Sequence, residues 1–194
     1  MGIRELWQKN REYISADTLD AAAVAARVSN LWFQVITAHL TRDAEPLKLY
    51  FSPDLYKRLE GSLDSFRAQR VFYAPVRPAV LQCGVASACV SGNRQMLTCA
   101  LLTRLIPQVQ PEGSTQGEDG SREVFSGEKW MLTRAADAVT RLPDQSVSTH
   151  CIKCGAPLSL YRSAKCPFCG NLVSVPDFNW TVEDISGAEN SLRI

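Results

Sequence analysis

The chain has 194 residues, of which 45% are hydrophobic and 21% are charged, and these values are typical of a globular protein with one main core. Its 21 basic and 20 acidic side chains give a formal net charge of +1, which excludes a global electrostatic attraction to nucleic acid or to an anionic membrane. The sequence has no apolar run long enough for a membrane-spanning helix and no secretory signal at its N-terminus. We therefore expect a cytoplasmic protein.

The first part of the chain predicts helices. Residues 1–14 form a short amphipathic pattern in which Ile3, Leu6, Trp7 and Ile14 share one side. A longer helix is expected to begin near Asp17 or Thr18, because either side chain can cap it. Its apolar positions recur at helical intervals, at Leu19, Val24, Val28, Leu31, Trp32, Val35, Ile36 and Leu40.

A third helix is predicted after a short helical turn that begins at Glu45-Pro46 and ends near Tyr50. Ser52 provides a cap, Pro53 fits the first helical position, and Asp54 places an acid in the first turn. Its buried face is expected to consist of Leu55, Leu59, Leu63 and Phe66.

From Val71 onward the apolar pattern changes to the alternation of strands. The predicted segments are Val71 to Val76, Val80 to Val90, Met96 to Ile106 and Val124 to Arg134, with a hairpin turn at Ser91-Gly92-Asn93-Arg94 and a stop at Pro107. Leu97, Cys99, Leu101 and Leu105 share one face, whereas residues 110–122 are polar and are predicted to be a mobile hairpin tip. Helices followed by antiparallel strands predict an α+β domain over residues 15–136, with the helices on one face of a curved sheet.

Four cysteines at the end of the chain have metal-binding spacing. Cys151 and Cys154, and then Cys166 and Cys169, form two C-x2-C-G pairs that are separated by 11 residues. Four thiolates can hold one Zn2+ in a closed tetrahedral site, so the zinc is expected to be structural. His150 is not needed as a ligand. This predicts a zinc ribbon over residues 150–176, preceded by a linker over 137–149.

Alternating apolar residues in the tail, residues 177–194, allow a further strand in either part of the protein; they are Phe178, Trp180, Val182 and Ile185. In the ribbon, Lys153, Arg162 and Lys165 give a local positive charge, but this supports nucleic-acid binding only weakly. Tyr161 and Phe168 are expected to form its small core. Nucleic acid is therefore an unlikely partner.

An enzyme on such a sheet would need a titratable group in its concavity. The strands between Ala79 and Val109 contain no Asp, Glu or His. His39 is expected to be a core or rim residue of its helix. We predict packing roles for the other candidates, which are Cys83, Cys89, Cys99, Tyr50, Tyr56 and Trp32.

Two segments resemble a known family. The run from Leu47 to Leu59, with its Ser-Pro-Asp-Leu-Tyr helix start, and the run from Gly127 to Arg134, with its late Trp, are similar to the domain named after Tim forty-four. That protein is the matrix-side subunit of the mitochondrial inner-membrane translocase, and bacterial relatives often carry a zinc ribbon after the domain.

The resemblance implies a cone-shaped fold of the nuclear-transport-factor-two type, in which helices close one side of a bent sheet. It also implies non-enzymatic work at the inner face of a membrane, with lipid contact and recruitment of transport or assembly partners. We therefore expect a binding or scaffold protein that has a protein partner and possible peripheral contact with the inner membrane. The alternatives are a small-ligand-binding protein or enzyme that uses the cone pocket, and a nucleic-acid-binding zinc ribbon protein.

Overall fold

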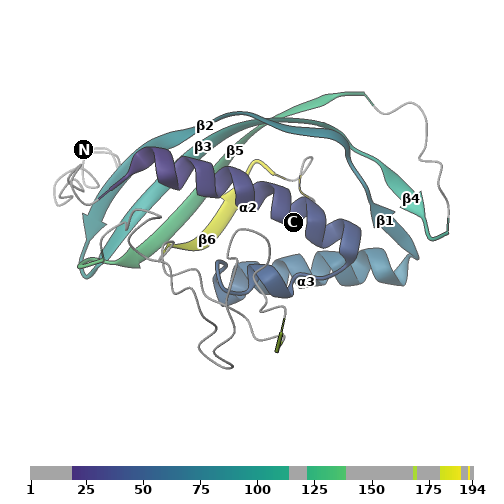
Figure 1. Cartoon of the computed structure of the whole chain (residues 1–194), viewed down its shortest axis with the longest axis horizontal. Coiled ribbons are helices and arrows are strands. Elements are labelled where there is room, and N and C mark those ends of the chain that lie inside the picture. Colours follow the sequence, from purple (N-terminus) through teal and green to yellow (C-terminus); the bar gives the residue numbers. More distant parts are fainter. Residues whose placement is uncertain (1–18, 114–121, 139–167, 170–179, 189–191, 193–194) are drawn as a thin grey trace, which may run out of the picture.

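The computed structural model describes residues 19–113, 122–138, 168–169, 180–188 and 192. Two α-helices lie on the concave side of a curved antiparallel sheet, so the predicted α+β class is confirmed (Figure 1). The predicted helix over residues 1–14, most of the predicted linker and nearly all of the predicted zinc ribbon lie outside the described residues.

The first described helix, α2 (Ala21–Thr41), begins later than the sequence predicted. The side chain of Asp20 accepts a hydrogen bond from the backbone N–H of Ala23 at 2.9 Å. This bond satisfies one of the free N–H groups of the first turn, so Asp20 caps the helix. The prediction of Asp17 or Thr18 was therefore wrong, because a nearer side chain takes this role.

One face of α2 is buried against the sheet. The apolar positions that the sequence placed on this face are buried at Val24, Val28, Leu31, Trp32, Val35 and Ile36. Leu40 is 46% exposed, contrary to the prediction. The buried stripe ends with Ala38 and His39, and Leu40 lies on the side of the helix that faces away from it.

A short 3₁₀ helix, η1 (Glu45–Leu47), and a turn through Tyr50 lead to the second α-helix, as predicted. This helix is α3 (Pro53–Ala68), and its first residue is the expected proline. Ser52 caps it by accepting a hydrogen bond from the N–H of Leu55 at 3.3 Å. Its inward side chains are Leu55, Leu59 and Leu63, which are buried, and Phe66, which is half-buried.

Among the described residues, six strands form two antiparallel sheets, one of four strands in the order β2-β3-β5-β6 and one of two strands, β1-β4. The strands are β1 (Val71–Tyr73), β2 (Val76–Ser91), β3 (Arg94–Ile106), β4 (Val109–Pro111), β5 (Val124–Ala135) and β6 (Thr181–Ser186). Strands β2, β3 and β5 are the long strands that arch over α2 (Figure 1).

The hairpin between β2 and β3 turns where the sequence predicted. Gly92 has φ of +58°, which a two-residue turn of this kind needs and a residue without a Cβ adopts without strain. Strand β3 ends before Pro107, also as predicted. The segment 110–122 is only in part the predicted loop, because residues 110 and 111 belong to β4, where pairing with β1 satisfies their backbone.

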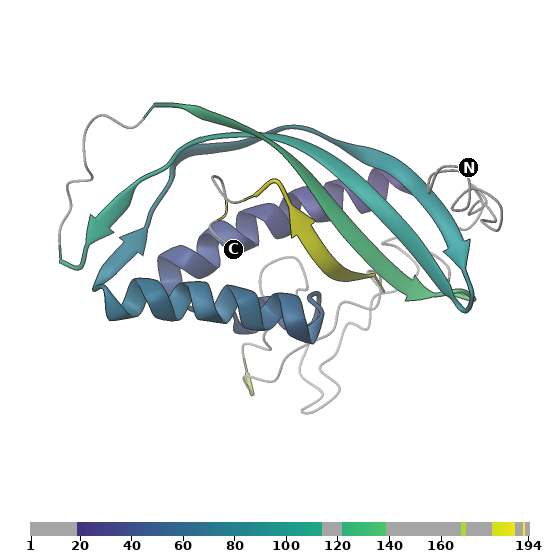
Figure 2. The same ribbon diagram turned by 180° about the vertical axis from the view of Figure 1, so that it is seen from behind.

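The alternating tail supplies the fourth strand of the main sheet. Strand β6 pairs with β5, so that Ile185 lies opposite Trp130. Val182 also exchanges backbone hydrogen bonds with the segment before α3, since its N–H donates to the carbonyl of Tyr50 at 2.7 Å and its carbonyl accepts from Ser52 at 2.9 Å. Figure 2 shows β6 between β5 and α3. The sheet therefore extends beyond residue 136, where the sequence placed the end of the main domain.

The core lies between the sheet and the helices and is built around three tryptophans. Trp32 of α2, Trp130 of β5 and Trp180 just before β6 are at most 2% exposed. Because fully burying large apolar side chains is the main stabilising contribution to a small core, these residues hold the helix, the sheet and the tail together.

Candidate functional site

The predicted zinc ligands fall mostly outside the described residues. Cys151, Cys154 and Cys166 are not described, whereas Cys169 lies in a turn and is exposed. Phe168 is 68% exposed, so the prediction that it forms the ribbon's small core was wrong. Within the described ranges, no group of three or more His, Cys, Asp or Glu side chains is placed to hold a metal ion. The zinc site stays a prediction from cysteine spacing.

The other ribbon residues that the sequence singled out are also outside the described residues; they are His150, Lys153, Tyr161, Arg162 and Lys165.

A buried carboxylate lies on the inner face of the sheet. Glu128 of β5 is 1% exposed, and its Oε1 accepts hydrogen bonds from the indole N–H of Trp32 and from the hydroxyl of Thr103, both at 2.9 Å. Its Oε2 accepts a third bond from the indole N–H of Trp130 at 3.0 Å. One carboxylate therefore joins α2, β3 and β5.

The position of Glu128 follows from strand alternation. On β5, Ser126, Glu128 and Trp130 point to the same face, and all three are buried. The register places Leu101 opposite Glu128 and Thr103 opposite Ser126, which brings the Thr103 hydroxyl to the carboxylate along a diagonal of the sheet.

The prediction that the strands lack an acid applied only to residues between Ala79 and Val109, and Glu128 lies beyond them on β5. A usable signal was present, since Glu128 is two residues before Trp130, and strand alternation places the two side chains on one face. An acidic residue that shares a strand face with a buried tryptophan is expected to be buried as well. A buried carboxylate then needs hydrogen-bond donors from neutral side chains.

The surroundings of Glu128 limit what it can do. General acid or base catalysis requires contact with a substrate proton. The three bonds hold both carboxylate oxygens inside the core, so a substrate could reach them only after α2 had moved away from the sheet. This arrangement favours a structural role for Glu128.

His39 is a core residue, as predicted. It is 2% exposed, and its ring lies with its edge toward Phe66 and Tyr73, at 5.5 Å between ring centroids in each case. Burial lowers the pKa of His39 to about 4. The backbone of Leu192 raises the pKa by a smaller amount, although neither ring nitrogen of His39 has a hydrogen-bond partner among the described residues. The imidazole is therefore neutral at pH 7.

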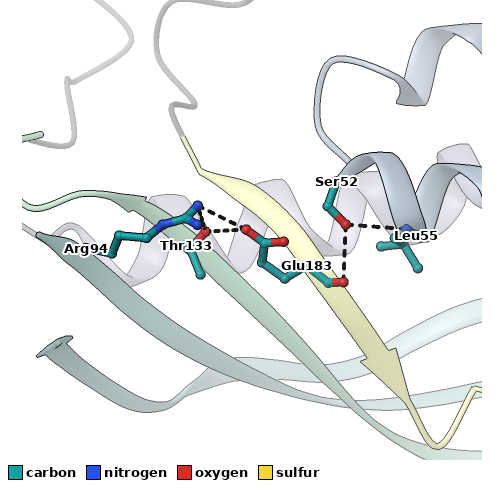
Figure 3. Close-up of polar contacts among 5 residues, drawn as sticks. All are labelled: Ser52, Leu55, Arg94, Thr133 and Glu183. Carbon is teal, nitrogen blue, oxygen red and sulfur yellow. Dashed lines mark hydrogen bonds and ion pairs between the residues drawn. The ribbon is translucent and has the colours of Figure 1, made fainter. Parts of the chain in front are cut away.

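A polar cluster fixes β6 against its neighbours (Figure 3). Arg94 of β3 lies 3.0 Å from the carboxylate of Glu183, and the hydroxyl of Thr133 donates to the same carboxylate at 2.6 Å. The backbone carbonyl of Glu183 accepts a bond from the Ser52 hydroxyl at 3.4 Å. Because exposed ion pairs contribute little free energy, the main effect of this cluster is to hold the register of β6.

The convex face of the sheet carries a set of exposed apolar side chains, which we call the outer strip. Its members are Leu81 (47% exposed), Leu102 (40%), Phe125 (59%) and Met131 (41%). They belong to β2, β3 and β5, and both described α-helices lie on the opposite face (Figure 2). Leu102 stays accessible because its partner on β5 is Gly127, which has no side chain. None of these four residues was predicted as a site residue from the sequence.

Among the described residues, none of the helices combines the length and the apolar character that crossing a membrane requires.

The fold and these sites define an α+β protein with helices on one face of an antiparallel sheet. No family model matches the sequence, and no curated protein matches it. Among solved structures, the chain is similar to the intermembrane space region of the chloroplast protein ARC6, with a TM-score of 0.49 and 12% sequence identity, over 87% of this chain and 95% of that chain. A similarity at this level carries no argument about function, so the resemblance to the Tim forty-four family stays a hypothesis.

Proposed function

We propose that this protein is a non-enzymatic binding protein that contacts a protein partner through the outer strip. The observation that carries the proposal is the exposure of four large apolar side chains on three adjacent strands. Monomeric proteins rarely leave contiguous apolar surface open without a use, and aromatic and other large apolar side chains are favoured at the centres of interfaces.

The polar side chains near the strip fit the rim of such an interface. Arg104 pairs with Phe125 across β3 and β5. Lys129 lies on the same strand face between Gly127, the partner of Leu102, and Met131, so it separates Met131 from the other three apolar side chains. The Nε of Arg104 lies 3.3 Å from the carboxylate of Glu123, an ion pair between two partly exposed side chains. An apolar centre with charged residues at its margin favours a protein partner over a small molecule.

The alternative is a small-ligand-binding protein or an enzyme that uses the inner face of the sheet. This is less favoured because the inner face is occupied by the three core tryptophans, and Glu128 is engaged by three hydrogen bonds. Native mass spectrometry of the purified chain separates the two, since a retained small molecule would support the alternative.

We further propose that the domain is a cone of the nuclear-transport-factor-two type and that a zinc ribbon follows it. Two helices on the concave side of a bent antiparallel sheet are compatible with such a cone. The donor set of Cys151, Cys154, Cys166 and Cys169 fits Zn2+, because four thiolates complete a tetrahedral structural site. Such a zinc ion would stabilise the ribbon and supply no catalytic chemistry.

The resemblance to the Tim forty-four family supports a role in membrane-associated protein transport or assembly, at the cytoplasmic face of the inner membrane. Nucleic-acid binding by the ribbon is the second alternative, and salt-dependent binding that is lost when Lys153, Arg162 and Lys165 are neutralised would support it.

Affinity purification of the full chain, with membrane and soluble fractions kept separate, tests the proposed function. The test variant is the double substitution Leu102→Ser with Phe125→Ser. The matched control is Phe33→Ser with Leu40→Ser, which removes two apolar side chains of α2 that are 40% and 46% exposed.

We expect a protein that is recovered with the wild type and the control to be lost with the test variant. Recovery of the same proteins by all three chains, at equal thermal stability, would contradict the proposal.

A further inference from the structure

The side of α2 that faces away from the sheet carries no charged residue, and we call it the outer α2 face. Its residues recur every three or four positions along the helix and are all exposed; they are Ala22, Ala26, Asn30, Phe33, Thr37 and Leu40. No described helix or strand lies over this side of α2 (Figure 1). Because a surface helix ordinarily has charged and polar side chains on its outer side, the outer α2 face has the composition of a covered one.

The polar groups of α2 do little to change this character. Arg27 is the one Asp, Glu, Lys or Arg residue of the helix, and its guanidinium lies beside the buried ring of Tyr50, 5.5 Å from the ring centre. The Thr37 hydroxyl donates to the carbonyl of Phe33 at 2.9 Å, and the Thr41 hydroxyl donates to the carbonyl of Thr37 at 2.8 Å. Since these hydroxyls are satisfied within the helix, their methyl groups are left to contact a partner.

The chain just before α2 supplies a matching segment. Residues 1–14 lie outside the described residues, and their sequence predicts an amphipathic helix. Its apolar side consists of Ile3, Leu6, Trp7 and Ile14. Residues 15–20 connect this segment to α2, and six residues are a typical length for a connection between two packed antiparallel helices. Leu19 packs against the core and Asp20 caps α2, so the described end of this connection is held in place.

The length of the segment determines which part of α2 it can cover. A helix of 14 residues is about 21 Å long. If it runs back along α2 from Ala22, it passes Phe33, which is about 16 Å along the helix, and it ends before Leu40, which is about 27 Å along it. In this antiparallel arrangement Ile3 lies beside Phe33, and Trp7 lies about one turn closer to the start of α2.

We propose that the outer α2 face, from Ala22 to Phe33, is the docking site of residues 1–14 of the same chain. Phe33 is the large apolar side chain of this stretch and is 40% exposed, so it is the main anchor for Ile3 and Trp7. A connected segment loses less translational freedom on docking than a separate molecule does, so a small contact area is sufficient. This inference does not depend on the proposed function.

Photo-crosslinking of the purified full chain tests the proposal. A benzophenone amino acid replaces Phe33, or it replaces Leu40 as the control that the segment cannot reach, and the adducts are identified by peptide mass spectrometry. We expect position 33 to give an adduct with a peptide from residues 1–14. The product should have the mass of one chain, and its yield should not change on dilution. Position 40 should not give this adduct.

Three results of this experiment would overturn the proposal. They are the absence of an adduct between position 33 and residues 1–14, the same adduct from positions 33 and 40, and an adduct found only in products with the mass of two chains. The last result would mean that a second copy of the chain covers the outer α2 face.

A double-mutant cycle provides a second, independent measurement. We expect the combination of Trp7→Ser with Phe33→Ser to lower the midpoint of thermal unfolding by less than the sum of the two single changes, because either change alone breaks the same contact. Trp7→Ser with Leu40→Ser is the matched control, and its two effects should add. Additive effects in both pairs would overturn the proposal. Flotation of the wild type with phosphatidylglycerol vesicles that is lost in Trp7→Ser would assign this side chain to a lipid surface and would also overturn it.

Discussion

Replacing Glu128 by Ala should lower the free energy of unfolding by at least about 2 kcal/mol. The change leaves the indole N–H groups of Trp32 and Trp130 without their acceptor, whereas the hydroxyl of Thr103 still has the carbonyl of Ser126 at 3.3 Å. A buried donor that loses its partner costs about 1 to 3 kcal/mol, and two donors lose theirs. The lost packing of the Glu128 side chain adds to this figure.

The Gln variant provides a graded comparison. Its amide keeps one carbonyl oxygen, which can accept from Trp32 and Thr103, but its NH2 group then faces the N–H of Trp130. One hydrogen bond is therefore lost, and we expect Glu128→Gln to cost about 1 to 3 kcal/mol, less than Ala.

Urea unfolding followed by tryptophan fluorescence and far-ultraviolet circular dichroism measures these losses. Glu112→Gln is the matched control, because Glu112 is an exposed acid that pairs with Arg42 at 3.0 Å and should contribute at most about 1 kcal/mol. If both Glu128 variants were as stable as this control, the carboxylate would not hold the core together and the reasoning would be refuted.

Three other predictions concern pH, backbone geometry and metal. Lowering the pH from about 6.5 to about 4 should reduce the free energy of unfolding by about 3 kcal/mol through His39, because the unfolded chain binds the proton first. In urea titrations, the free energy of unfolding of His39→Phe should depend less on pH than that of the wild type. The same pH dependence in both proteins would contradict this prediction. Gly187→Ala should lower the midpoint of thermal unfolding markedly, because Gly187 has φ of +81° and a Cβ would lie 2.3 Å from the carbonyl oxygen of Gly127. An unaltered midpoint would contradict this close approach of the two backbone segments. Metal analysis of reduced protein should find about one zinc ion per chain, and Cys166→Ser should lose it; full zinc in the variant would argue against the four-cysteine site.

Local chemistry made parts of the fold predictable from the sequence. The start of α3 was correct because its signals, Ser52 and the proline after it, act within one turn of the helix. The turn at Gly92 was correct for the same reason. The start of α2 was wrong because Asp20 competes with two other possible caps, and propensity alone does not rank them.

Strand β4 was missed because its backbone is satisfied by β1, which lies far away in the sequence and leaves no trace in local composition. The place of β6 was open for the same reason, since alternation predicts a strand but not its neighbour.

The candidate sites also combine features that the local sequence predicts with features that only the fold determines. The inward position of Glu128 could be read from alternation with Trp130, but its three donors come from elements that only the fold brings together. The outer strip depends on which face of the sheet the helices leave uncovered. Each of these is a tertiary property, so residue spacing does not contain it.

Site-specific photo-crosslinking in the cells that make the protein tests the central claim most directly. A benzophenone amino acid is placed at position 102 on the outer strip, or at position 40 on α2, where the wild-type side chains are 40% and 46% exposed. The account predicts a discrete protein adduct from position 102 that is absent from position 40. No adduct from position 102, or the same adduct from both positions, would contradict a binding function centred on the outer strip.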